Sequence, residues 1–370
     1  MNISAVINRL ESWAPLAYQE SYDNAGLICG NPEAACTGVL CSLDCTEEVV
    51  QEAVRKGCNL VVAHHPIVFA GLKKITPHSY VGRAITAAIL NGVNIYAIHT
   101  NLDNIEGGVS FKMAEKLGLE PSTVKVLEPK NSQLYMLYTY VPTPQAKLVY
   151  EALFAAGAGH IGRYAECAFA LEGTGSFRPL EGTNPTIGNA GGPREYVNET
   201  KLEVIFPKHL YQRVINALHK AHPYETVAYQ VVKIENNWEQ VGSGAVGHLP
   251  TPMSQPDFLN WLCQTFKLPV VKHTLGRQKI ISKVALCGGT GFFLLRKAIA
   301  AGADAFITSD LKYHEYFEAD GQLLLADIGH FESEQYTIEL LQTFLQANFP
   351  TFAVLKAEVG TNPVHYFLPG

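Results

Sequence analysis

Short apolar runs alternate with helical patterns over the first third of the chain. The runs GVLCSLD, NLVVAHHP and NIYAIHTNLD are separated by TEEVVQEAVRKG and SYVGRAITAAILNG, which carry apolar residues at helical spacing. Thr46 is a suitable N-cap for the first of these helices, and Gly57 can end it in a left-handed turn. This alternation predicts βαβ units and a mostly parallel sheet.

The same alternation returns near Lys283, in KVALCGG, DAFITSD, LLLADIGH and TFAVLKA. Between these strands we expect a helical stretch around Tyr313 and His314, and one long helix in ESEQYTIELLQTFLQ. The middle of the chain instead follows a β-α-β-β-α-β order, which is the ferredoxin-like pattern. We therefore predict an α/β domain of two βαβ-type portions, residues 1–127 and 236–370, interrupted by a ferredoxin-like α+β module at residues 128–235.

Composition narrows the classes of function. Charged residues make up 17% of the chain and the formal net charge is -6, so binding to duplex DNA is not expected. The start of the chain has no basic, apolar leader, and no later run has the roughly 18 apolar residues of a membrane span. The eight cysteines form no C-x-x-C pair, which favours a reduced, cytoplasmic protein.

Imidazole and carboxylate side chains follow two of the early strands. His64 and His65 come directly after NLVVA, and Asp103 follows NIYAI. The carboxyl ends of parallel strands are where open α/β sheets bind ligands, so we expect these side chains at one rim. Pro66 ends regular pairing, which lets the two imidazoles diverge toward neighbouring ions. His99 is a secondary candidate, either as a ligand or as a partner that orients one.

A third strand, LLLAD, is followed by His330 and Glu334, whose i, i+4 spacing suits chelation of one ion or bridging of two. Gly329 allows a close backbone approach. A lone histidine pair, or an isolated His-x-x-x-Glu, is more often packed or solvated than metal-bound. The convergence of three strand ends favours a metal site. We therefore predict that two divalent cations are held by His64, His65, Asp103, His330 and Glu334.

This donor set indicates the chemistry of the site. Nitrogen and oxygen donors without thiolate favour zinc, iron, manganese, cobalt or nickel over calcium or an iron–sulfur cluster. Two such ions lower the pKa of a shared water, so hydrolysis is the expected reaction. Asp310, Lys312 and His314 in TSDLKYHEY are candidates for substrate contact, with Asp310 and His314 as the proton-transfer residues.

Two further motifs each have two interpretations. The segment CGGTG, from Cys287 to Gly291, could cradle a phosphate with its backbone N–H groups or form a tight turn that needs small residues. No lysine follows it, so it is not a Walker motif. Asp23 and Asn24 precede a glycine-containing run and could order the site, but we interpret them as turn formers.

Taken together, DNAGL, VVAHHP, AIHTNLDN, CGGTG, TSDLKYHE and DIGHFESE resemble the GTP cyclohydrolase I type 2 homologue family, the Nif-three-like dinuclear metal-centre proteins. The resemblance implies a dinuclear site with ligands at the five positions predicted above, and makes Glu334 the bridging carboxylate. It also implies a toroidal homohexamer. The middle module, with GHIGRY and HPYET, is similar to the CutA or PII-like insertion of some bacterial members, which suggests three-fold contacts.

Two functions are compatible with these features. The first is a metal-dependent hydrolase that acts on a nucleotide or phosphoester, with opening of the purine ring of GTP as the reaction that the family name implies. The second is a non-catalytic, metal-binding or regulatory scaffold in which the inserted module binds an effector or partner. Turnover by the metal-replete protein distinguishes the two.

Overall fold

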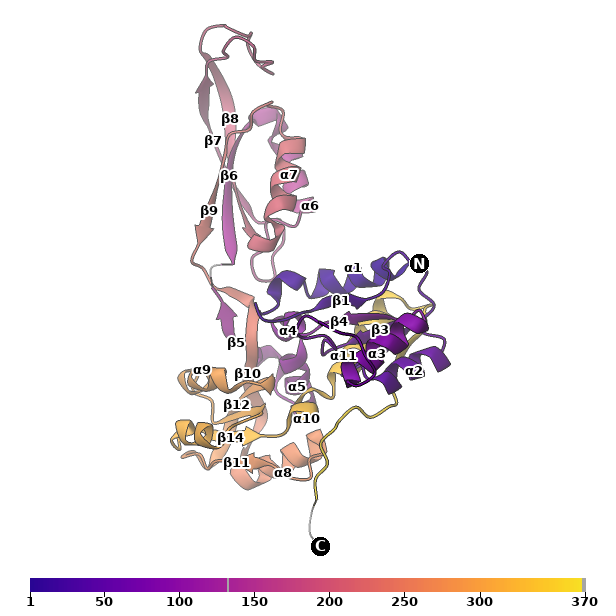
Figure 1. Cartoon of the computed structure of the whole chain (residues 1–370). Helices are drawn as coiled ribbons and strands as arrows, with labels where there is room; N and C mark the ends of the chain where they lie inside the picture. The colour runs from indigo at the N-terminus through magenta and orange to yellow at the C-terminus, as the bar shows by residue number, and fades with distance from the viewer. Residues whose placement is uncertain (132, 368–370) are drawn as a thin grey trace. The chain divides into compact units, whose positions relative to one another are not determined.

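The structure is a computed structural model that describes residues 1–131 and 133–367. Its contacts divide the chain into two compact units, residues 1–128 with 240–370 and residues 129–239. The first unit holds two β-sheets and the second holds one (Figure 1). Within the described residues, the helices all fall short of the length and apolar character needed to cross a bilayer.

The first sheet of the larger unit has five strands in the order β1-β4-β3-β2-β15. They are β1 (Gly26–Cys29), β4 (Asn94–Ala97), β3 (Leu60–Ala63), β2 (Val39–Ser42) and β15 (Val354–Lys356). All neighbours are parallel except β1, which runs antiparallel to β4. The predicted first crossover is confirmed, because the Thr46 side chain caps α2 (Glu47–Arg55) and Gly57 has a φ of 69°.

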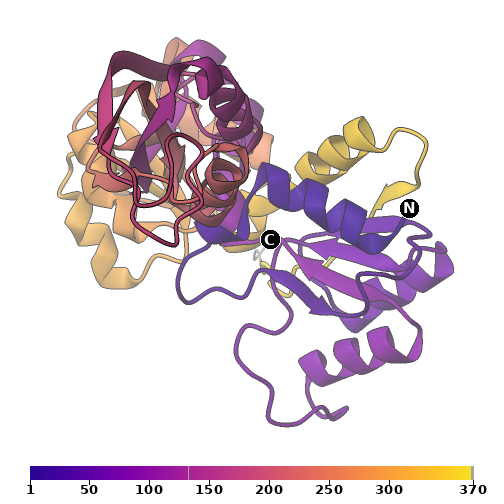
Figure 2. The same ribbon diagram turned by 90° about the horizontal axis from the view of Figure 1, so that it is seen from above.

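Helices cover both faces of this sheet, because its buried central strands are apolar at most positions. Leu60 and Val62 pack in a core with α1 (Ile3–Trp13) and α11 (Thr337–Asn348). Val61 and Ala63 pack on the other face with α2 and α3 (Tyr80–Leu90). Figure 2 shows these helices on opposite sides of the sheet. Alternate residues of one strand thus belong to two cores, which produces a three-layer α/β/α arrangement.

The second sheet of this unit has six strands in the order β11-β14-β13-β12-β10-β5. They are β11 (Lys272–His273), β14 (Leu324–Asp327), β13 (Ala305–Ser309), β12 (Ile280–Thr290), β10 (Trp238–Ser254) and β5 (Lys125–Lys130). The central strands β12, β13 and β14 are parallel. Residues of α5 (Val109–Leu117) and α8 (Gln255–Phe266) pack in one core of this sheet, and residues of α9 (Leu295–Ala300) in another.

One helical prediction in the last third needs correction. The expected long helix is divided into α10 (His330–Glu334) and α11. The division has a packing cause, because Tyr336 packs against the core of the second sheet whereas Leu341 and Leu345 of α11 belong to the core of the first. The helical stretch expected around Tyr313 and His314 is confirmed, as the 3₁₀ helix Tyr313–Ala319.

The second unit has the predicted β-α-β-β-α-β order. Its elements are β6 (Leu134–Pro142), α6 (Ala146–Ala155), β7 (Ala168–Phe177), β8 (Glu195–Pro207), α7 (Tyr211–Ala221) and β9 (Tyr229–Ile234). The sheet order is β7-β8-β6-β9 and every described neighbour pair is antiparallel. Apolar residues of both helices share one core with the sheet. This is the ferredoxin-like topology expected from the sequence.

Candidate metal centre

His64 and His65 extend the backbone pairing of β3 by two residues. The His64 N–H donates to the Ser42 carbonyl at 3.2 Å, and the His65 N–H donates to the Leu43 carbonyl at 2.9 Å. The two rings are 5.0 Å apart between centroids and their planes are inclined by 46°. The His64 side chain is fully buried, whereas that of His65 is 22% exposed. The pair therefore presents two differently oriented nitrogens at the carboxyl end of the strand.

Asp103 and His99 reach the same place from the neighbouring strand. The short helix α4 (Thr100–Asp103) follows β4, and His99 is the residue just before it. The Asp103 carboxylate lies 3.7 Å from His64 Nε2. The centroids of the His64 and His99 rings are 5.3 Å apart. Two neighbouring parallel strands thus bring three imidazoles and one carboxylate together.

His330 and Glu334 come from the second sheet, through the helix that follows β14. Glu334 is 3% exposed, and its two oxygens face different histidines. Oε1 lies 3.8 Å from His64 Nε2, and Oε2 lies 2.9 Å from His65 Nε2 and 3.2 Å from His330 Nε2. The carboxylate therefore lies between donors from both sheets, which is the geometry that a bridging ligand requires.

Two overlapping groups in this cluster could hold a metal ion, with ligand atoms within 4.8 Å of one another. One consists of His64, His65 and His99, and the other of His65, His330 and Glu334. The structure thus brings together all five predicted ligands and the secondary candidate His99. Whether each of them binds a metal stays a prediction.

The four imidazoles are all held through Nδ1 by an oxygen atom. The pairs are His64 with the Ile98 carbonyl at 2.8 Å, His65 with Asp44 at 2.7 Å, His99 with Asp23 at 2.7 Å and His330 with Asp310 at 2.5 Å. A carbonyl or an ionised carboxylate only accepts, so Nδ1 is the donor. In the neutral ring this leaves the Nε2 lone pair available, which is the state that metal-binding histidines need.

Two buried atoms in the cluster call for a positively charged partner. His64 Nε2 and Asp103 Oδ1 are buried without a hydrogen-bond partner among the described residues. An unsatisfied buried polar atom is costly, and native proteins rarely keep one without a reason. A cation bound at about 2.0–2.2 Å by nitrogen and oxygen donors separates them by roughly 3–4 Å, which agrees with the 3.7 Å between these atoms. The residues present therefore fit a divalent cation.

The cluster also shifts the pKa values of its members. Burial alone lowers the pKa of His65, but hydrogen bonds with Asp44 and Glu334 outweigh it and raise the pKa to about 9. Burial also lowers the pKa of His330, but hydrogen bonds with Asp310 and Glu334 outweigh it and raise the pKa to about 11. Burial and the nearby Glu334 raise the pKa of Asp103 well above its usual range. The metal-free cluster therefore retains protons that a bound cation would displace.

A hollow of about 470 Å³ opens on the cluster and is lined by His65, His99, Asp103, His330 and Glu334 among others. Four aromatic side chains line it too, and each is more than half exposed: Tyr22, Phe69, Tyr80 and Phe293. Cys287 is also in the wall, but burial and the nearby carboxylates raise the pKa of its thiol. A protonated thiol is a poor ligand, which agrees with a site built from nitrogen and oxygen donors.

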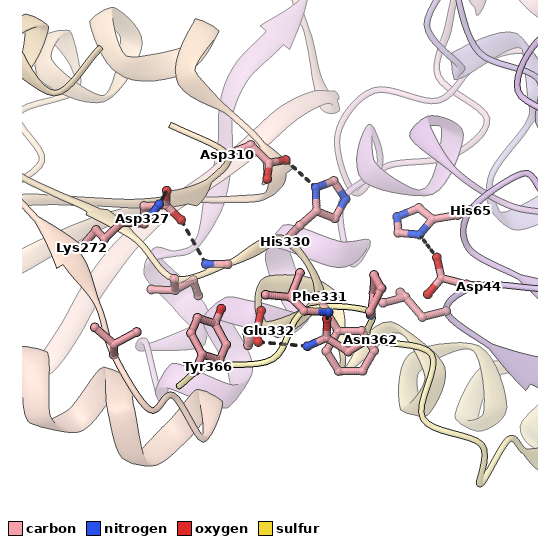
Figure 3. A pocket seen from close by; sticks show the side chains of 16 residues that line it. Asp44, His65, Lys272, Asp310, Asp327, His330, Phe331, Glu332, Asn362 and Tyr366 are labelled. Carbon is pink, nitrogen blue, oxygen red and sulfur yellow. Dashed lines mark hydrogen bonds and ion pairs between the residues drawn. The ribbon is translucent and has the colours of Figure 1, made fainter. Parts of the chain in front are cut away.

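The two predicted proton-transfer residues, Asp310 and His314, lie in different surroundings. Asp310 accepts hydrogen bonds from His330 Nδ1 and from the Thr290 hydroxyl, so it orients His330 and is not a free acid or base. Figure 3 shows Asp310 directed at His330, and Asp44 directed at His65. His314 lines a different hollow with Phe292 and Arg296. The structure therefore gives no geometric support to His314 as a group that acts beside the metals.

The CGGTG segment lies at the end of β12, where two of its backbone N–H groups already have hydroxyl partners. The Gly288 N–H donates to the Ser110 hydroxyl at 3.4 Å, and the Gly289 N–H donates to the Ser333 hydroxyl at 2.9 Å. Gly289 has a φ of 60°, and a Cβ atom there would lie 2.5 Å from Glu334 Oε1. The absence of a side chain at Gly289 therefore leaves space for the Glu334 carboxylate.

Sequence reasoning missed the carboxylates that orient the histidines. Asp44 follows β2 by two residues, a position that could have indicated a role at the same rim. Asp23 was interpreted as a turn former, and its N–H does donate to the Glu20 carbonyl in a turn, but the alternative role in ordering the site is also present. Its carboxylate accepts from His99 Nδ1 and from the backbone and hydroxyl of Thr100. Its contacts with His99 and Thr100 span more than 70 residues, so no local pattern reveals them.

The fold and the cluster define the class: an α/β protein whose histidine and glutamate groups could hold a metal ion. The sequence profile of the Duf34/NIF3 family (NGG1p interacting factor 3) matches residues 1–363. A Halalkalibacterium halodurans protein named GTP cyclohydrolase 1 type 2 homolog is 38% identical over 368 residues, 98% of each chain. The Bacillus subtilis protein of that name is 38% identical over 333 residues, 90% of this chain and 88% of its own.

The chain is also similar to a solved structure of a NIF3-related protein. The crystal structure of a Bacillus cereus protein related to NIF3 covers 99% of both chains with a TM-score of 0.85 and 35% identity. The chain belongs to the Duf34/NIF3 family.

Proposed function

We propose that this protein binds two divalent cations in the cluster and is a metal-dependent hydrolase of a nucleotide or phosphoester. The observation that carries the proposal is that the four histidine rings make the same kind of hydrogen bond. Each is fixed through Nδ1 by an oxygen, so that Nε2 is left for a ligand bond. A cluster of chance imidazoles has no reason to share one orientation.

The side chains of the cluster have distinct roles in this proposal. Glu334 reaches donors from both sheets, with Oε1 toward His64 and Oε2 toward His65 and His330. Asp103 adds a second carboxylate beside His64. Divalent cations held by this set would supply Lewis-acid activation of water and of a phosphoryl or carbonyl oxygen.

The aromatic side chains around the hollow favour a substrate with a flat ring. Tyr22 and Phe69 are neighbours, with ring centroids 6.3 Å apart. The Asn24 side chain donates to the Val68 carbonyl at 2.6 Å and so ties the loop of Tyr22 to that of Phe69. Exposed aromatic faces at the mouth of a polar hollow are suited to stacking on a nucleobase. This supports a nucleotide over a small aliphatic phosphoester.

The first test is elemental analysis followed by a turnover assay on GTP, other nucleotides and simple phosphoesters. We expect about two metals per chain, in line with a two-metal site. His65→Ala and Glu334→Gln should lose metal and turnover. Glu339→Gln is the matched control, because Glu339 pairs with Lys112 and Lys116 and not with the cluster. Wild-type protein that retains no metal would refute the proposal.

A second candidate is a non-catalytic, metal-binding scaffold. The observation that favours it is the engagement of Asp310 with His330 and the location of His314 in another hollow, which leaves neither predicted residue free for proton transfer. Metal-loaded protein that converts no member of the substrate panel would support this candidate. Raised KM values for nucleotides in Phe69→Ala and Phe293→Ala, with kcat retained, would exclude it.

A further inference from the structure

The segment after β15 makes a series of contacts that end at the metal cluster. The Ala357 N–H donates to the Cys41 carbonyl, which extends the edge of the first sheet. The next two backbone N–H groups, of Glu358 and Val359, donate to the Glu52 carboxylate at 2.9 and 3.0 Å. The path of residues 357–359 is thus fixed by hydrogen bonds and not only by packing.

Thr361 continues this path to a carboxylate of the cluster. Its hydroxyl donates to Asp44 Oδ2 at 2.6 Å, while Asp44 Oδ1 accepts from His65 Nδ1 at 2.7 Å. One carboxylate therefore joins the C-terminal segment to a candidate ligand. Without the hydroxyl, Asp44 would keep only His65 as a side-chain partner among the hydrogen bonds of the structure. Its orientation would then be set by a single contact.

The following residues contact the helix that bears the other two ligands. Asn362 Nδ2 donates to Glu332 Oε1 at 3.1 Å, and Glu332 lies between His330 and Glu334 in α10. Figure 3 shows Asn362 and Tyr366 beside Glu332. Asn362 and Tyr366 also line the cavity of about 640 Å³ that opens on His65 and His330.

We infer that the C-terminal segment is part of the metal centre, with Thr361 as a positioning residue that acts through Asp44 on His65. Asn362 is likewise a positioning residue, which acts through Glu332 on α10. The segment thereby links the two sheets at the cluster, because Asp44 follows a strand of the first sheet and Glu332 follows a strand of the second. This inference rests on the proposed metal binding and adds to it a role for residues outside the ligand set.

The test is zinc affinity of the full chain, measured by competition with a chromophoric chelator, for wild type and Thr361→Val. Valine keeps the shape of threonine and removes only the hydroxyl. Changes to partners that orient a metal-binding histidine cost about 10–100-fold in affinity, and we expect about 10-fold here because Thr361 acts through Asp44. Thr361→Ser should restore the wild-type affinity. Asn362→Ala should weaken zinc binding as well.

Thr37→Val is the matched control, since the Thr37 hydroxyl donates to the Gly57 carbonyl at 2.8 Å in the same unit and does not contact the cluster. A second readout is the visible absorption of the cobalt-loaded protein, which follows ligand geometry and not stability. Thr361→Val should alter it, whereas Thr37→Val should not.

The outcomes distinguish the two proposals. If wild-type protein binds no zinc, the proposed function fails. If wild type binds zinc and Asp44→Asn weakens zinc binding, the metal site stands. If Thr361→Val and Thr361→Ser then both match wild type in zinc affinity and cobalt absorption, the positioning role of Thr361 is overturned. Equal loss in Thr361→Val and Thr361→Ser would also overturn it.

Discussion

Replacing Gly289 by alanine is a sharp perturbation of the proposed metal site, because it adds one carbon atom next to one carboxylate. The new Cβ would lie 2.5 Å from Glu334 Oε1, whereas ordinary contacts begin at 3.4 Å. The carboxylate must therefore move by about 0.9 Å, and metal–ligand distances tolerate only about 0.2 Å. We expect zinc affinity to fall on the order of 100-fold.

The backbone also contributes, since Gly289 has a φ of 60° and a left-handed alanine costs about 1–2 kcal/mol. Gly302→Ala controls for this cost, because Gly302 has a φ of 70° and open space around its Cβ position. Calorimetric unfolding of the metal-free proteins should show a similar loss of stability for both variants. Chelator competition should show weak zinc binding for Gly289→Ala alone.

Wild-type zinc affinity and two metals per chain in Gly289→Ala would contradict this expectation. Glu334 could not then be a ligand in the position described. Equal loss of affinity in Gly289→Ala and Gly302→Ala would assign the effect to general destabilisation and not to the displaced carboxylate.

Three further predictions follow from burial and charge. Zinc binding near pH 7.5 should release protons, because the pKa values of His65 and His330 are raised to about 9 and about 11. Calorimetry in buffers of different ionisation enthalpy measures the number of protons released. Zinc binding without proton release would contradict the role of these two histidines as ligands. Burial lowers the pKa of His209 from 6.5 to about 4, so its contribution to stability is complete above pH 6.5 and is lost as the pH falls toward 4. Its partial exposure limits the effect to about 1–2 kcal/mol, and urea unfolding should show a flatter pH profile for His209→Gln. Phe258→Ala should lower the free energy of unfolding by about 3–5 kcal/mol because Phe258 is fully buried, whereas Phe258→Leu should cost far less; similar losses for the two would show that its cavity collapses.

The order of helices and strands could be predicted from the sequence wherever local patterns determine where an element begins and ends. Thr46 and Gly57 mark their helix through capping and a positive φ, which are local properties. The division between α10 and α11 was not predictable in this way. It arises because Tyr336 and Leu341 pack in the cores of two different sheets, and their helical spacing is the same in either case.

The site was predictable to the extent that its donors follow apolar strands. His64 could be selected in this way, because a polar residue just after a buried strand lies at the rim of a sheet. Glu334 could be selected by its i, i+4 spacing to His330. Their hydrogen-bond partners could not be selected. Asp310 has a similar sequence position to the donors, and only the fold shows that it is directed at His330. Thr361 lies 317 positions from Asp44, in a segment with no regular pattern.

The division of the cluster between two distant stretches of chain has a consequence for biosynthesis. His64, His65 and His99 leave the ribosome before the unit of residues 129–239, and His330 and Glu334 leave after it. At about 5–20 residues per second, this interval is on the order of ten seconds or more. A nascent chain therefore has three of the imidazoles well before the Glu334 carboxylate exists. Under the proposed metal binding, the ion that first reaches these imidazoles during translation would depend on the metals that are free in the cell at that time.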